Sequence, residues 1–189
     1  SGSTNNANPA NLSAVVPRPE PTPVAGSLLV ARPELIDPNF RRALVFVAAH
    51  DNKDGTLGFI LNRPTGRKLN DFVVSQADLN DLNEIPVFLG GPVGTSQLLL
   101  AALEWTEQRT VEFRHNLAPD KLAELAESPR VAVRAFVGYA GWAAGQLEQE
   151  MQENSWLVVP PEKWLLDPGM CVNGWPRILR TLGPFYRLM

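Results

Sequence analysis

The chain has 189 residues, of which 44% are apolar and 20% are charged, and its net charge is −3. A chain of this length buries roughly two-thirds of its surface and needs no disulfide or metal to form a core, and its composition is that of an ordinary globular protein. The acidic balance argues against nucleic-acid binding, because the neutralisation of phosphates supplies most of that affinity.

Three features predict a cytosolic protein with no membrane span. The single cysteine, Cys171, cannot form an internal disulfide, which favours a reducing compartment. No run of about 18 apolar residues is present. The N-terminus also lacks the basic start and apolar stretch of a signal peptide.

The charge is unevenly distributed along the chain. Residues 25–70 carry seven Lys and Arg against four Asp and Glu, whereas residues 71–189 carry nine against fifteen. Two interpretations remain open: an anion-binding face in the N-terminal half, or a spread of charge over a solvated surface.

Residues 1–24 are predicted to form a flexible, Pro-rich tail, and residues 25–189 a single domain. The tail holds five prolines and few large apolar side chains, so burial cannot offset the entropy lost on ordering. Its PRPEPTP segment is expected to be extended as polyproline II. A docking segment for a proline-binding partner is the alternative.

The first predicted elements are a short strand in SLLVARP and a hairpin. DPNFRR separates them as one helical turn, with Asp37 as the cap and Pro38 in the first helical position. ALVFVAAH and TLGFILNRP are apolar at both parities, as in strands covered on both faces. The DNKDG turn between them places Gly55 where positive φ is needed.

The remaining pattern alternates strands and helices irregularly, which predicts an α+β fold with a mixed sheet. The predicted elements are a short helix over residues 69–74, strand, glycine turn and strand in PVFLGGPVGTSQLLLAALE, a strand in EQRTVEFRHN, a helix from Pro119, a strand in VAVRAFVGYAG, a surface helix of about three turns in WAAGQLEQEMQENSW, and a last strand in WLVVP.

No catalytic constellation, metal site or cofactor motif is evident. The two histidines, His50 and His115, lie on separate segments without zinc-ligand spacing. The GxSxG, P-loop and GxGxxG patterns are absent. His50 ends a buried strand and has either a satisfied structural role or that of a base, although no partner for it is visible in the sequence. Cys171 has no cationic neighbour in sequence, which favours a structural thiol.

Two other features admit both a binding and a structural interpretation. Arg41 and its neighbour Arg42 can hold an anion, or they can pair with a nearby carboxylate. Tyr139 and Trp142 lie among glycines, where they can stack on a ring-shaped ligand or fill the space at a strand-to-helix joint.

The glycine-rich LGGPVG segment is ambiguous in the same way. Its backbone N–H groups can form an anion nest, but a strand-like segment follows where a phosphate loop would have a helix. A tight turn that requires glycine is the alternative.

Several of these segments together resemble the AlgH/YqgE family of bacterial proteins. The matching stretches cover roughly half of the chain and are GSLLVARPELIDPNFRRALVFVAAHDNKDGTLGFILNRP, PVFLGGPVG and GYAGWAAGQLEQEMQENSWLVVP. The resemblance implies a cytosolic α+β domain whose mixed sheet is strongly curved, partly barrel-like and flanked by helices. It also implies regulation, since the family name comes from a proposed link to alginate production and members are often labelled as transcriptional regulators.

Nine of the family-type positions that this sequence keeps form the candidate ligand or interaction surface. They are Arg41, His50, Asn62, Gly90, Gly91, Tyr139, Trp142, Gln146 and Glu150. Some relatives carry a cysteine just before the matching histidine. Ala48 and Ala49 stand there in this chain, so thiol chemistry is not expected at that point.

Three functions follow as hypotheses. The first is a non-enzymatic regulatory or interaction protein, with a protein or small ligand as partner and no direct DNA contact, since no helix-turn-helix is recognisable. The second is a small-ligand-binding protein or enzyme with a cleft near His50, Arg41, Asn62, Tyr139 and Trp142. The third is nucleic-acid binding by the basic half, which predicts affinity that falls steeply with salt.

Overall fold

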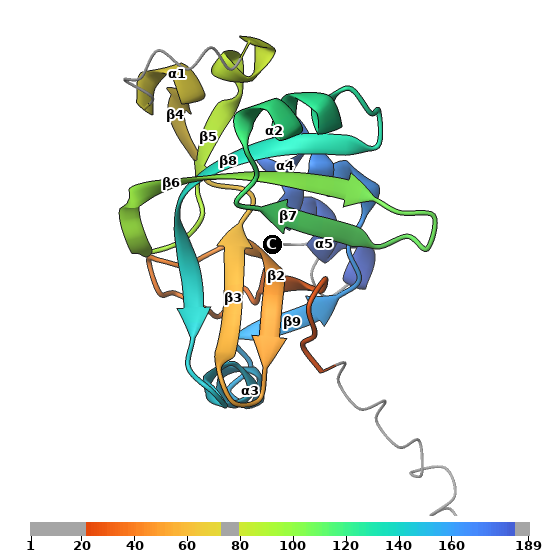
Figure 1. Ribbon diagram of the computed structural model, residues 1–189. Helices are drawn as coiled ribbons and strands as arrows, with labels where there is room; N and C mark the ends of the chain where they lie inside the picture. The colour runs from red at the N-terminus through yellow and green to blue at the C-terminus, as the bar shows by residue number, and fades with distance from the viewer. Residues whose placement is uncertain (1–21, 73–79, 184–189) are drawn as a thin grey trace, which may run out of the picture.

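The computed structural model describes residues 22–72 and 80–183, and these form a curved mixed sheet flanked by short helices (Figure 1). The strands in this part of the chain are β1 (Leu28–Ala31), β2 (Leu44–Asp51), β3 (Gly55–Ile60), β4 (Pro64–Lys68), β5 (Pro86–Leu89), β6 (Val93–Trp105), β7 (Val111–His115), β8 (Val131–Trp142) and β9 (Trp156–Val159). The helices are α1 (Leu69–Phe72), η2 (Asn80–Glu84), α2 (Pro119–Ala126), α3 (Gln146–Gln152), η3 (Lys163–Leu166), α4 (Pro168–Cys171) and α5 (Gly174–Leu182).

The strand order is β4-β5-β8-β3-β2-β1-β9, with β6 paired to β8 and β7 paired to β6. The β5–β8 pair is parallel, and the other pairs among the described strands are antiparallel. The predicted α+β class with a curved mixed sheet is confirmed. The sheet stays open, so the barrel-like expectation holds for its curvature only.

The long strand β8 joins the two halves of the sheet. Its first part pairs with β5 and β6, and its last residues, from Ala140, pair with β3. Gly138 lies at the change of direction with φ +73°, and a Cβ there would meet the Gly91 carbonyl oxygen at 2.3 Å. Figure 1 shows β8 passing from the β6–β7 layer down to the edge of β3. Glycine is therefore required where the sheet bends.

Helices cover both faces of the curved sheet. From α3, Leu147 and Met151 pack on one face, as their spacing predicts. From α5, Trp175, Ile178 and Leu179 pack on the other face. The C-terminal helices were not predicted, although this i, i+3, i+4 spacing is present in the sequence.

Most predicted elements before residue 160 are confirmed. The β2–β3 hairpin forms with Gly55 at φ +92°. The Asp37 carboxylate accepts from the Asn39 N–H at 2.9 Å, and the Arg41 N–H donates to the Asp37 carbonyl at 2.7 Å, which closes the predicted turn. Helix α3 has seven residues, fewer than the three turns expected.

One predicted strand pairing is wrong, and two predicted segments are described only in part. The strands β5 and β6 on either side of the glycines do not pair with each other, and both pair with β8 instead. The expected helix over residues 69–74 ends, in the described part, at Phe72, while its last two positions and residues 1–21 of the predicted tail lie outside the described residues. No helix within the described ranges is long and apolar enough to cross a membrane.

Candidate functional site

The structure distributes the predicted cleft over two hollows. His50, Tyr139 and Trp142 line one of about 610 Å³ beside the β2–β3 turn. Arg41 and Asn62 line another of about 330 Å³ next to the start of α5. The two hollows have no lining residue in common, so they are separate candidate sites.

His50 has two partners that the sequence does not reveal. Its Nδ1 lies 2.6 Å from the Thr56 hydroxyl oxygen, and its Nε2 lies 3.1 Å from a carboxylate oxygen of Glu148 on α3. The ring thus ties the hairpin to the helix that covers it. Because both ring nitrogens are engaged and Thr56 is only 6% exposed, the arrangement favours the structural interpretation of His50.

Trp142 belongs to a packed aromatic cluster at the joint between β8 and α3. It is 4% exposed, and its ring stacks on Phe40 with centroids 5.6 Å apart. Glu150 accepts hydrogen bonds from the indole N–H of Trp142 at 3.4 Å and of Trp156 at 3.3 Å. Gln146 accepts from the backbone N–H of residue 143 at 3.0 Å, at the start of the helix. These three predicted site residues therefore hold α3 in place, while Tyr139 remains at the rim of the hollow.

The glycine pair packs against β8. A Cβ on Gly90 would lie 2.4 Å from the Gly138 carbonyl oxygen, and one on Gly91 would lie 2.1 Å from the Tyr139 carbonyl oxygen. Real Cβ atoms do not approach backbone atoms so closely, because the packing of protein interiors leaves no such space. The geometry favours close strand packing over an anion nest.

Cys171 has a cation beside it in space, although none adjoins it in sequence. The Arg134 guanidinium lies 3.7 Å from its sulfur, and the thiol donates to the Leu165 carbonyl at 3.2 Å. Burial raises the pKa of Cys171, and Arg134 offsets this only in part. The thiol is therefore neutral and enclosed, in agreement with the structural role predicted for it.

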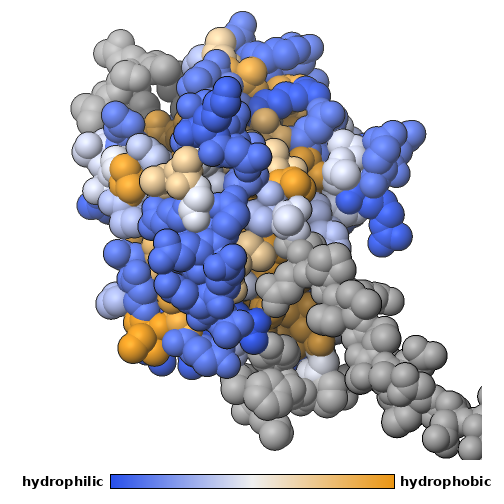
Figure 2. Space-filling model, turned by 90° about the horizontal axis from the view of Figure 1, so that it is seen from below, coloured by the Kyte–Doolittle hydropathy of each residue, from blue (hydrophilic) through white to orange (hydrophobic). Residues whose placement is uncertain are grey.

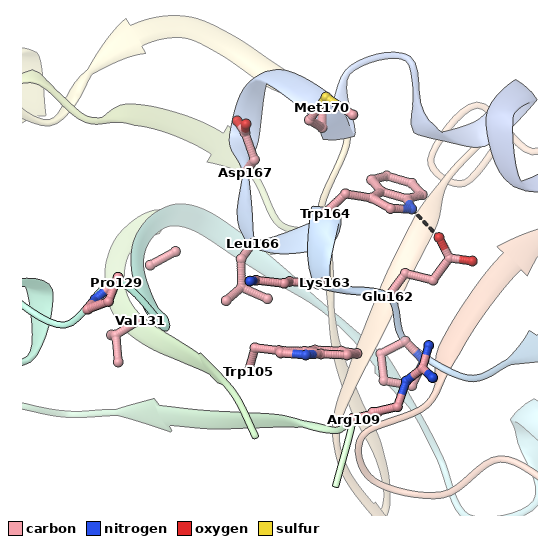
Figure 3. Close-up of a pocket in the computed structure, with 12 residues that line it drawn as sticks. Trp105, Arg109, Pro129, Val131, Glu162, Lys163, Trp164, Leu166, Asp167 and Met170 are labelled. Atoms are coloured by element: carbon pink, nitrogen blue, oxygen red, sulfur yellow. Dashed lines mark hydrogen bonds between the residues drawn. The ribbon is translucent and has the colours of Figure 1, made fainter. Parts of the chain in front are cut away.

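A third hollow, larger than the two hollows above, was missed by the sequence reasoning. It measures about 1010 Å³ and lies between the β6–β7 turn, the α2–β8 connection and the η3–α4 segment. Figure 3 shows the Trp105 indole along one side with Arg109 beside it, while Lys163 and Trp164 come from η3. Since these segments are far apart in the chain, no local motif could have indicated the hollow.

The local structure of each segment explains the placement of these side chains. The β6–β7 turn is closed by a hydrogen bond between the hydroxyl groups of Thr106 and Thr110, 2.6 Å apart, and by the Arg109 N–H, which donates to the Thr106 carbonyl at 3.1 Å. Arg109 takes φ +62°, which is uncommon for a residue with a Cβ. On the opposite side, Glu162 accepts the indole N–H of Trp164, which orients that ring.

Two cationic and two anionic side chains line this hollow, and among the described residues only the cations have no hydrogen-bond or ion-pair partner. Within residues 22–72 and 80–183, the side chains of Arg109 and Lys163 make no ion pair or hydrogen bond. The carboxylates of Glu162 and Asp167 also line the hollow, but each accepts a local hydrogen bond, from Trp164 and from the Gly169 N–H. Two uncommitted cations next to an indole face can hold a flat ring that carries a negative group.

Metal binding finds no geometric support in the described part of the chain, where no three His, Cys, Asp or Glu residues are grouped suitably. No broad apolar patch is visible among the described residues on the face that carries α3. Figure 2 views the molecule from that side and shows mainly hydrophilic side chains with small, separate hydrophobic areas.

Comparison with known proteins gives consistent matches along most of the chain. The family model described as AlgH-like matches residues 28–187. A UPF0301 protein of Streptomyces coelicolor is 37% identical over 171 residues, which cover 85% of this chain and 88% of the relative. A UPF0301 protein of Methylococcus capsulatus is 37% identical over 150 residues, covering 74% and 78%.

Two solved structures share the fold. Protein DIP2367 of Corynebacterium diphtheriae superimposes with a TM-score of 0.70 at 21% identity, covering 89% of this chain and 92% of that one. The AlgH protein of Pseudomonas aeruginosa gives a TM-score of 0.56 at 26% identity, covering 89% and 87%.

Proposed function

The chain belongs to the AlgH-like family, and we propose that it is a cytosolic regulatory protein that acts by binding a small molecule without catalysing a reaction on it. The observation that carries this proposal is the hollow of about 1010 Å³ with the Trp105 indole beside two uncommitted cations, Arg109 and Lys163. Pockets for small ligands are concave, mostly apolar and supplied with a few polar groups that fix orientation.

The ligand class follows from the lining. A flat ring stacks on the Trp105 indole, and an anionic group on that ring binds Arg109 and Lys163. Such a ligand would connect the β6–β7 turn to the η3–α4 segment. Binding would therefore restrict the relative movement of two surface segments, which is a means of signalling to a protein partner. Contact with DNA is not required.

The experiment is native mass spectrometry of the protein gently isolated from its own cells. We expect a bound mass of a few hundred daltons on the wild-type protein. The double variant Arg109→Gln/Lys163→Gln should lose it, because both side chains are exposed and their removal leaves the core intact. Arg180→Gln, which removes an exposed arginine outside the hollow, is the matched control and should retain the ligand. A bare wild-type protein, or a mass retained by the double variant, contradicts the proposal.

An enzymatic alternative rests on one observation, the chain of contacts from Thr56 through His50 to Glu148. Carboxylate, imidazole and hydroxyl groups form such chains in hydrolases. Turnover of an ester or amide substrate that His50→Ala abolishes, with the circular dichroism spectrum unchanged, would establish this alternative. Turnover that persists in His50→Ala would exclude a catalytic role of His50 and would also contradict the non-catalytic function, whereas no turnover by the wild-type protein supports the binding function.

A further inference from the structure

Positive charge is concentrated in the hollow of about 330 Å³ next to the start of α5. This hollow lies between the turn before β2, the segment after β3 and the start of α5, and it is lined by Arg41, Arg42 and Arg63 together with Asn62 and Asn173. No Asp or Glu is among its lining residues in the described ranges. The wall thus has three cations and no carboxylate of its own.

Arg63 is held rigidly at this wall. Its two terminal nitrogens donate to the backbone carbonyls of Asn39 and Arg41, the latter at 2.7 Å. Burial lowers the pKa of Arg63, and the Asp37 carboxylate raises it only in part. The guanidinium is therefore a fixed, partly desolvated cation whose charge the neighbouring residues compensate incompletely.

Arg42 is positioned by a separate set of contacts. Its guanidinium carbon lies 5.4 Å from the Trp175 ring centroid, and the indole N–H donates to the Ala31 carbonyl at 2.7 Å. Its backbone takes φ +58°, an uncommon conformation for a residue with a Cβ. The Asn62 amide maintains this turn, since it donates to the Arg42 carbonyl and accepts from the Leu44 N–H, both at 2.9 Å.

Arg41 completes the cluster as its uncommitted member. Among residues 22–72 and 80–183 its exposed side chain makes no ion pair or hydrogen bond. Two pre-positioned guanidinium groups with a third that is free to close over a ligand form an arrangement suited to oxyanions, because the planar fork of arginine matches phosphate oxygens in pairs.

We propose that this hollow binds a phosphate dianion, either as free phosphate or as the phosphate group of a small monoester. The volume lies at the lower end of the roughly 300 to 1,000 Å³ usual for ligand pockets, which suits a compact group. Three cations match a dianion better than a singly charged carboxylate. The hollow shares no lining residue with the one around Trp105, so this site is independent of the proposed function.

The test is isothermal titration calorimetry at constant ionic strength with inorganic phosphate and, separately, glycerol 3-phosphate. We expect Arg41→Gln and Arg42→Gln each to raise the dissociation constant about tenfold or more, since each removes a charge-assisted hydrogen bond. Arg180→Gln is the control because it removes an exposed arginine of α5 that does not line the hollow. Its dissociation constant should stay within about twofold of the wild-type value.

The two ligands distinguish the source of the phosphate. Tighter binding of glycerol 3-phosphate assigns the site to monoesters, and equal or tighter binding of inorganic phosphate assigns it to the free ion. Arg41→Gln keeps the test meaningful if Arg42→Gln disturbs its strained turn, because the Arg41 side chain holds no other part of the described structure. The proposal is overturned if neither inorganic phosphate nor glycerol 3-phosphate gives a heat of binding. It is also overturned if Arg41→Gln and Arg180→Gln raise the dissociation constant equally.

Discussion

Replacing Arg134 by methionine should destabilise the protein by about 2 to 4 kcal/mol. The side chain is 1% exposed, and its guanidinium donates to the carbonyls of Leu61 at 3.0 Å and Leu165 at 3.1 Å. Its central carbon also lies 4.4 Å from the Phe88 ring centroid. One cation thereby connects β8, the end of β3 and the η3–α4 segment.

The magnitude follows from which partners lose their bonds. Methionine leaves the buried Leu61 carbonyl without its donor, which costs roughly 1 to 3 kcal/mol. The Leu165 carbonyl keeps the Cys171 thiol as a donor and loses less. The contact with Phe88 contributes about 2 kcal/mol when desolvated. Burial of the guanidinium charge is itself unfavourable, and it lowers the pKa of Arg134. Methionine removes this cost, which offsets part of the stability lost.

Urea denaturation followed by circular dichroism measures this loss. An unchanged m value would show that the variant and the wild-type protein expose the same amount of surface on unfolding. Arg130→Met is the matched control, since the Arg130 side chain is exposed and its one ion pair within the described residues is a 3.8 Å contact with Glu107; this variant should change stability by at most about 1 kcal/mol. If Arg134→Met were as stable as Arg130→Met, the guanidinium would not hold the three segments together and the reasoning would be refuted.

Three further predictions concern Gly138, Cys171 and Glu150. Gly138→Ala should lower the free energy of unfolding, measured by urea denaturation, by roughly 2 to 5 kcal/mol. The causes are the positive φ and the 2.3 Å distance from the new Cβ to a carbonyl oxygen. A loss below about 1 kcal/mol would show that β8 can bend elsewhere. Burial raises the pKa of Cys171 in the folded state, so the unfolded state releases the thiol proton first, above about pH 8.5. The free energy of unfolding is therefore unaffected by this thiol below that pH and declines as the pH rises toward the folded pKa. Cys171→Ser should show a shallower decline between pH 8 and 10, and equal slopes would contradict the shift. Glu150→Ala should lose about 1 to 3 kcal/mol and alter the near-ultraviolet circular dichroism of the tryptophans, whereas Glu150→Gln should retain both because its amide oxygen still accepts.

The local elements could be predicted because their signals are local. Gly55 in DNKDG specified the hairpin turn, and Pro119 marked the first residue of α2. Two of the C-terminal helices, η3 and α4, were missed because they have only four residues each, whereas α5 has nine residues and its apolar spacing was overlooked. Helices so short are stabilised by packing more than by propensity, so their sequence carries little signal.

The candidate sites depend on contacts between distant segments, which one sequence does not contain. Glu148 is a polar residue on a surface helix until the fold brings it to the ring of His50. Trp105 ends a strand, and only the position of η3 turns its indole into the wall of a hollow. Residue type led to the prediction of His50 and Arg41 as site residues, but it could not indicate that they lie in different hollows.

Regional net charge was also an incomplete guide to anion binding. The basic segment 25–70 supplies the three arginines that line the hollow of about 330 Å³. Arg109 and Lys163, however, come from residues 71–189, where acidic residues predominate. Charges farther apart than about 8 Å are largely screened at physiological salt, so the carboxylates elsewhere in that region have little effect at the hollow. The groups that line a cavity and lack partners, rather than the balance along the chain, therefore determine where an anion binds.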